Sequence, residues 1–134
     1  SVAVHGGALA VGSPEEDSCS TTIINGAGEY PTDNGCSNAG AVFVYERIDG
    51  NWTPTAYIKA PNARQGHWFG FSVALHNDTL VVGAPNEDGC SSFVVNGVAE
   101  YPDSYCPSDA GAAHVFVRSG GAWAAQAHIK APNT

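Results

Sequence analysis

Carboxylate side chains gather in two long segments of the chain, and their type and number would suit a metal ion. Glu16-Asp17 in the first segment returns as Glu87-Asp88 in the second. Calcium takes about six to eight oxygen ligands from carboxylates, amides and backbone carbonyls. Turn capping by the same side chains is the alternative, because no regular Asp-x-Asp-x-Asp-Gly spacing occurs. The candidate calcium ligands are Glu16, Asp17, Asp33, Glu87, Asp88, Asp103 and Asp109.

The same two segments carry a polar and aromatic motif. Asn25-Gly26 is followed by Tyr30, and Asn96-Gly97 is followed by Tyr101. An exposed tyrosine beside amide and carboxylate groups can stack on a sugar ring. Asn25, Tyr30, Asn96 and Tyr101 are therefore candidate ligand-binding residues for a glycan. Asn-Gly is first of all a turn sequence, so a purely structural role is the alternative.

Groupings that would support catalysis do not occur in the sequence. No spacing suggests a Ser/His/Asp arrangement, no H-E-x-x-H motif occurs, and no glycine-rich loop opens a helix. We expect no catalytic residues and no enzymatic activity.

Composition excludes other classes of partner. The chain has 134 residues, a formal net charge of -8 and only five lysines and arginines. Nucleic-acid binding depends on basic side chains that neutralise phosphates, and an anionic membrane surface attracts the same residues. The sequence also has no apolar run long enough to span a bilayer. We expect neither nucleic acid nor membrane as a partner.

Four cysteines lie at nearly equivalent places in the two segments. Cys19 and Cys36 are 17 positions apart, and Cys90 and Cys106 are 16 positions apart. A four-thiolate zinc site usually has close C-x₂₋₄-C pairs, which are not present here. The symmetry favours the disulfides Cys19–Cys36 and Cys90–Cys106, each stabilising the fold by about 3 kcal/mol. Disulfides predict an oxidising compartment, so we expect a secreted or cell-surface protein.

These segments belong to a repeat with an offset of 71 residues. Trp52 returns as Trp123, and the run Ile58-Lys59-Ala60-Pro61-Asn62 returns as Ile129-Lys130-Ala131-Pro132-Asn133. Repeats of this size usually form units that bury their faces by stacking on neighbours. We expect a first unit over residues 1–62, a linker over 63–71 and a second unit over 72–134.

Each unit shows short β-branched apolar segments between turn residues, which predicts strands. Four strands per unit would form an antiparallel meander, and the long segment between the second and third strands would be an excursion of about 25 residues. The inner strands are apolar on both sides of the pleat, which is typical of a sheet covered on both faces. The predicted strands are Ser1–Val4, Ala8–Gly12, Ala41–Arg47, Trp52–Ala60, Ser72–Leu75, Thr79–Ala84, Ala112–Arg118 and Trp123–Ala131.

Three segments resemble the FG-GAP repeat, the blade motif of integrin α-subunit propellers and of many bacterial surface and secreted proteins. They are Phe69-Gly70-Phe71-Ser72-Val73-Ala74, Leu80-Val81-Val82-Gly83-Ala84-Pro85 and Gly111-Ala112-Ala113-His114-Val115-Phe116-Val117. The resemblance covers nearly the whole chain and is closer to the bacterial type. It implies an all-β fold of two four-stranded antiparallel propeller blades, with a role in adhesion or ligand binding. The integrin-type calcium loop between the first two strands is not implied, because that connection is too short here.

Two blades cannot close a propeller, which usually has about four to eight. Left alone, the two blades would expose large apolar faces. We therefore expect identical chains to complete a closed ring head to tail. The expected function is a non-catalytic scaffold or adhesion module. The alternative is a carbohydrate-binding, lectin-like propeller with calcium as the candidate cofactor and a glycan or cell-surface molecule as the ligand.

Overall fold

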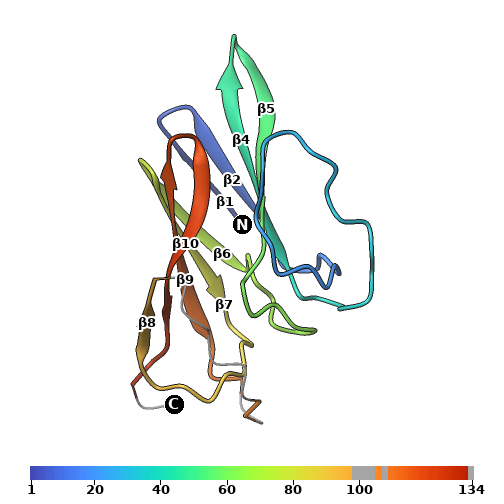
Figure 1. The fold of residues 1–134 in the computed structure, drawn as a ribbon, viewed down its shortest axis with the longest axis vertical. Coiled ribbons are helices and arrows are strands. Elements are labelled where there is room, and N and C mark those ends of the chain that lie inside the picture. The colour runs from blue at the N-terminus through green and yellow to red at the C-terminus, as the bar shows by residue number, and fades with distance from the viewer. Residues whose placement is uncertain (98–104, 107–108, 133–134) are drawn as a thin grey trace.

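The computed structural model describes residues 1–97, 105–106 and 109–132, and the regular elements of this part are all β-strands. They form two antiparallel sheets that follow one another along the chain (Figure 1). No helix long and apolar enough to cross a membrane occurs among the described residues. The prediction of an all-β chain with two blade-like sheets is confirmed.

The first sheet has the strand order β1-β2-β4-β5-β3. Tight turns join β1 to β2 and β4 to β5, and a long loop runs from β2 through β3 to β4 (Figure 1). Its strands are β1 (Val2–His5), β2 (Ala8–Ser13), β3 (Ile24–Asn25), β4 (Ala41–Ile48) and β5 (Asn51–Ile58).

The second sheet repeats this topology in the order β6-β7-β9-β10-β8. All eight strands expected from the sequence are present in the two sheets, with ends that shift by a residue or two. The strands of the second sheet are β6 (Ser72–His76), β7 (Thr79–Ala84), β8 (Val94–Asn96), β9 (Ala112–Ser119) and β10 (Ala122–Ile129).

The prediction of four strands per unit is wrong, because each long loop contributes a fifth. Ile24 and Asn25 pair with Tyr57 and Ala56 of β5, and β8 pairs in the same way with β10. An outermost strand leaves backbone N–H and C=O groups unpaired, so a loop segment lying beside it gains hydrogen bonds. These strands of two or three residues are too short to show an alternating pattern in the sequence. Pro54 lies in the part of β5 that β3 leaves uncovered, where a missing N–H costs nothing.

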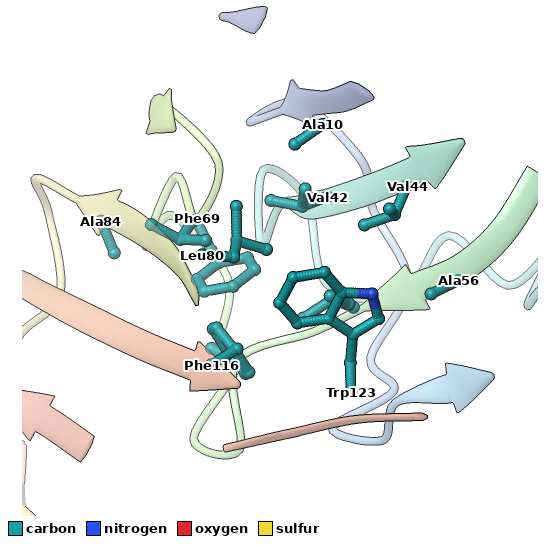
Figure 2. Close-up of a cluster of buried hydrophobic side chains, with 12 residues drawn as sticks. Ala10, Val42, Val44, Ala56, Phe69, Leu80, Ala84, Phe116 and Trp123 are labelled. Carbon is teal, nitrogen blue, oxygen red and sulfur yellow. The ribbon is translucent and has the colours of Figure 1, made fainter. Parts of the chain in front are cut away.

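The main hydrophobic core lies between the two sheets. Alanine and valine side chains of the first sheet face larger side chains of the second, including Leu80, Phe116 and Trp123 (Figure 2). Phe69 comes from the connection between the sheets and is fully buried in the same cluster. The two units therefore stack face to face, as the repeat predicts.

Glycines allow this connection to lie directly against the first sheet. A Cβ atom on Gly12 would lie 2.0 Å from the carbonyl oxygen of Gly70, and one on Gly40 would lie 2.0 Å from that of Phe69. Gly70 itself has a φ of 91°, a conformation that favours glycine. The Phe-Gly pair thus joins the units by inserting a ring into the core while its backbone touches the sheet. The exact unit boundaries at residues 62, 71 and 72 stay a prediction.

Candidate functional site

The long loop of the first unit is anchored by Glu16, which lies just after β2. Lys59, at the end of β5, is buried and donates from Nζ to Glu16 Oε2 at 2.7 Å and to the carbonyl oxygen of Ser18 at 2.8 Å. The hydroxyl of Tyr57 donates to Glu16 Oε1 at 2.9 Å. Burial and then the adjacent Glu16 raise the pKa of Tyr57, so its hydroxyl remains a donor. The Glu16 carboxylate therefore ties the start of the loop to the end of the sheet.

Two further acids hold the turns of the same loop. Asp17 accepts from the backbone N–H of Asn38 at 2.7 Å. Asp33 accepts from the Ser18 hydroxyl at 2.7 Å and from the Cys19 amide at 2.8 Å. These two donors, the Cys19 amide first, lower the pKa of Asp33. The predicted disulfide Cys19–Cys36 closes the loop beside them.

The second unit repeats the anchor with a fully buried carboxylate. Lys130 donates from Nζ to Glu87 Oε2 at 2.5 Å, and Asn62 of the first unit donates to Glu87 Oε1 at 2.8 Å. His128 lies 3.6 Å from the same oxygen. Burial alone would raise the pKa of Glu87, but the adjacent His128 and the hydrogen-bonded, charged Lys130 outweigh it and hold the pKa at about 2. The second predicted disulfide, Cys90–Cys106, is also present.

Three histidines gather beside this carboxylate, between the two sheets. His67 contacts Asp88 at 2.9 Å, and the ring of His114 packs 4.9 Å from that of His128 and 5.3 Å from that of Phe69. Burial, and then the neighbouring His128, lower the pKa of His114 to about 3. His114 is therefore neutral at ordinary pH and serves as a packing side chain.

The carboxylates proposed as calcium ligands thus bind groups of the chain itself. Glu16, Asp17, Asp33, Glu87 and Asp88 all have partners of this kind. Asp109 is exposed, and Asp103 lies outside the described residues. In the described ranges no group of three or more histidine, cysteine, aspartate or glutamate residues is arranged to hold a metal ion. Calcium binding stays a prediction.

The candidate ligand residues also make contacts within the chain. Asn25, in β3 of the first sheet, binds the backbone of Trp123 in the second sheet through both ends of its amide. Tyr30 stacks on Tyr57, with ring centroids 5.3 Å apart. Asn96 is exposed at the end of β8, and Tyr101 lies outside the described residues. Glycan binding by these residues stays a prediction.

Lysine residues were missed as part of this arrangement, although the sequence held the signal. Glu16 and Lys59 are 43 positions apart, and so are Glu87 and Lys130. A pair of opposite charges that recurs at the same spacing in both units indicates a contact that each unit repeats within itself. The Lys-Ala-Pro-Asn run of the first unit therefore binds the anchoring carboxylates of both loops. Lys59 binds Glu16, and Asn62 binds Glu87.

Each unit also leaves part of one apolar face exposed. On the outer face of the first sheet, Trp52 is 48% exposed, whereas its repeat counterpart Trp123 is 3% exposed in the core. On the outer face of the second sheet, Ile129 is 38% exposed, whereas its counterpart Ile58 is fully buried. Each partly exposed face is thus the repeat counterpart of a face that is buried between the two sheets.

Comparison with known proteins agrees with this architecture. Residues 52–99 match the family model described as FG-GAP repeat. This stretch of the chain is similar to an FG-GAP repeat. The matched stretch runs from β5 of the first sheet, through Phe69 and Gly70, to the second long loop, so the FG-GAP match includes both sides of the contact between units. Searches of curated proteins and of solved structures gave no match.

The FG-GAP motif has a physical basis in this fold. Phe69 fills the space between the sheets, and Gly70 permits the close backbone contact with Gly12 described above. Gly83 in turn leaves room for the side chain of Ser72, whose Oγ would lie 2.3 Å from an added Cβ. FG-GAP repeats form β-propeller-like modules that bind other molecules, and the two disulfides of this chain indicate an oxidising, extracellular environment.

Proposed function

We propose that this chain is a non-catalytic β-propeller module of a secreted or cell-surface protein, and that copies of it stack head to tail into a closed ring. The observation that carries the proposal is the pair Trp52 and Trp123. The two tryptophans occupy the same repeat position, but Trp52 is half exposed and Trp123 is buried. The difference arises because the neighbouring sheet of the chain covers Trp123 and does not cover Trp52. A second copy offers the matching face, because its second sheet carries Ile129, Val81 and Val115 where the first sheet carries Ile58, Ala10 and Val44.

The contact within the chain therefore serves as a template for the contact between chains. A heterologous contact of this kind either closes by rotation or continues as a filament. Blades that stack around an axis close. A ring of whole chains would contain an even number of blades, with three or four chains as the simplest solutions.

Light scattering after gel filtration under non-reducing conditions tests this assembly. The expected mass is three or more times the chain mass of 13.8 kDa. Trp52→Glu would place a charge in the contact and should return the protein to a monomer, while Trp52→Phe keeps an apolar ring and should retain the assembly. A wild-type protein that stays monomeric at high concentration would contradict the proposal.

The long loops supply the binding surface of such a module. They are the longest connections of the fold, and binding residues are found disproportionately on loops held by a rigid scaffold. A disulfide and a lysine–glutamate pair hold each loop in place. We propose a glycan or another cell-surface molecule as the ligand. A glycan array probed with and without calcium tests this role. No binding to any glycan in either condition would contradict it.

A further inference from the structure

Asn25 binds one residue of the neighbouring sheet with both ends of its side-chain amide. Its Nδ2 donates to the carbonyl oxygen of Trp123 at 3.2 Å, and its Oδ1 accepts from the Trp123 amide at 2.8 Å. Trp123 lies in the part of β10 that β8 does not cover, since β8 pairs only with Ala127, His128 and Ile129. The amide of Asn25 therefore satisfies an open strand edge on the next unit.

Asn96 occupies the same position in the second unit as Asn25 does in the first. Asn25 pairs with Ala56 and Asn96 with Ala127, which are repeat counterparts. The following glycine is held alike in both units: Gly26 donates to the Thr55 carbonyl at 2.7 Å, and Gly97 donates to that of Gln126 at 2.6 Å. The side chain of Asn96 is exposed and has no hydrogen-bond partner among the described residues. The second unit thus presents the same amide without a strand edge to bind.

Trp52 offers the matching edge on the first unit. It lies opposite Arg47, as Trp123 lies opposite Arg118, so both tryptophans have the same place in the ladder. Backbone groups in an antiparallel pair point alternately toward and away from the partner strand. The N–H and C=O of Trp52 therefore point to the open edge, as those of Trp123 do. β3 covers only Ala56 and Tyr57 and leaves this edge free.

We infer that Asn96 fixes the register between copies by pairing its side-chain amide with the backbone N–H and C=O of Trp52 in a second copy of this chain. This inference rests on the proposed head-to-tail stacking and adds the residue that positions it. Flat apolar faces hold two sheets together but permit sliding along the strands, whereas a two-point hydrogen bond to one residue is directional.

The experiment compares three variants of the full chain by sedimentation equilibrium. Asn96→Ala removes both hydrogen bonds and should weaken self-association about tenfold, as expected for two net hydrogen bonds. Asn96→Asp should weaken it further at neutral pH, because a carboxylate beside the Trp52 carbonyl cannot donate. Asn34→Ala, an exposed asparagine elsewhere in the first loop, is the matched control and should leave the association constant unchanged.

Thermal unfolding at dilution separates assembly from folding. Asn96→Ala should keep the wild-type midpoint, whereas Asn25→Ala should lower it, because Asn25 binds Trp123 of the same chain. A wild-type protein that does not associate would overturn both the stacking and this inference. A wild-type protein that associates, with Asn96→Ala associating equally well, would overturn the role of Asn96 and leave the stacking intact.

Discussion

The two units of this chain have the same topology, yet equivalent residues lie in different surroundings. Trp123 is buried where Trp52 is half exposed, and Ile58 is buried where Ile129 is partly exposed. The difference follows from position in the stack, because the first unit has a neighbour on one face only and the second on the opposite face only. The free energy that a repeat residue contributes is therefore set by the neighbouring unit as much as by its own sheet.

The loop anchors differ in a second way. Glu16 is bound by Lys59 and Tyr57, and its side chain keeps some contact with solvent. Glu87 is bound by Lys130 and lies beside His128, and its side chain is fully buried. One anchor lies at a free surface and the other lies where the units meet, so removal of an equivalent group should have unequal effects.

The largest difference is expected between the two tryptophans. Trp123→Ala should lower the free energy of unfolding by about 3–5 kcal/mol, because it removes a buried ring and leaves a cavity between the sheets. Trp52→Ala should change it by less than about 0.5 kcal/mol at concentrations where the chain is monomeric. Denaturant unfolding of both variants at dilution measures this. Equal losses would show that the outer face of the first sheet is covered within the chain.

A smaller difference is expected between the lysines. Lys130→Met leaves the buried Glu87 carboxylate without its cation and should cost about 3–5 kcal/mol. Lys59→Met should cost less, about 1.5–3 kcal/mol, because Glu16 keeps the Tyr57 hydroxyl and part of its hydration. The two midpoints in a urea titration provide the measurement. The reverse order would mean that burial of the carboxylate does not control its dependence on lysine.

Acid should act on the second unit through His114. Burial lowers the pKa of this histidine from 6.5 in the unfolded chain to about 3 in the folded chain, so the unfolded state binds more protons between these values. Stability should therefore fall as the pH drops below 6.5, by about 1.4 kcal/mol per unit, and the loss should reach about 2 kcal/mol at pH 5. Glu87, with its pKa held at about 2, loses its own contribution only as the pH falls below 4.5.

Denaturation midpoints between pH 5 and pH 7 isolate the histidine from the carboxylate. His114→Phe introduces the residue that the first unit has at position 43 and should flatten the profile. Phe43→His is the matched reverse change and should add a shallower slope, because Phe43 is only partly buried. An unchanged slope in His114→Phe would assign the acid sensitivity to another group.

Sequence patterns predicted the strands and the disulfides of this fold, because short-range residue spacing and repeat symmetry determine them. The eight main strands follow from β-branched runs between turn residues, and the two disulfides follow from the symmetric positions of Cys19, Cys36, Cys90 and Cys106. The contact of Asn25 with Trp123 joins residues 98 positions apart and depends on how two sheets stack, which no local pattern encodes. For this reason sequence reasoning gave Asn25 only a candidate ligand-binding role and missed its contact with the next unit.

The smallest change in stability is expected for an ion pair that forms between the two sheets of one chain and has no equivalent between copies. Arg118 of the second sheet forms an ion pair with Glu46 of the first, and its guanidinium lies 5.4 Å from the ring centroid of Trp123. Glu46→Gln should lower stability by less than about 1 kcal/mol, because both side chains are partly exposed, and high salt should remove the difference. Unfolding at low and high salt measures both.

The same ion pair also tests whether copies meet in the way that the two sheets of one chain meet. Val117 is the repeat counterpart of Glu46, so a contact between copies would place a valine, not a carboxylate, opposite the equivalent Arg47. Glu46→Gln should therefore weaken the fold of a single chain without changing the association between chains. A loss of association in Glu46→Gln would mean that copies meet through a surface other than the counterpart of the contact between the two sheets.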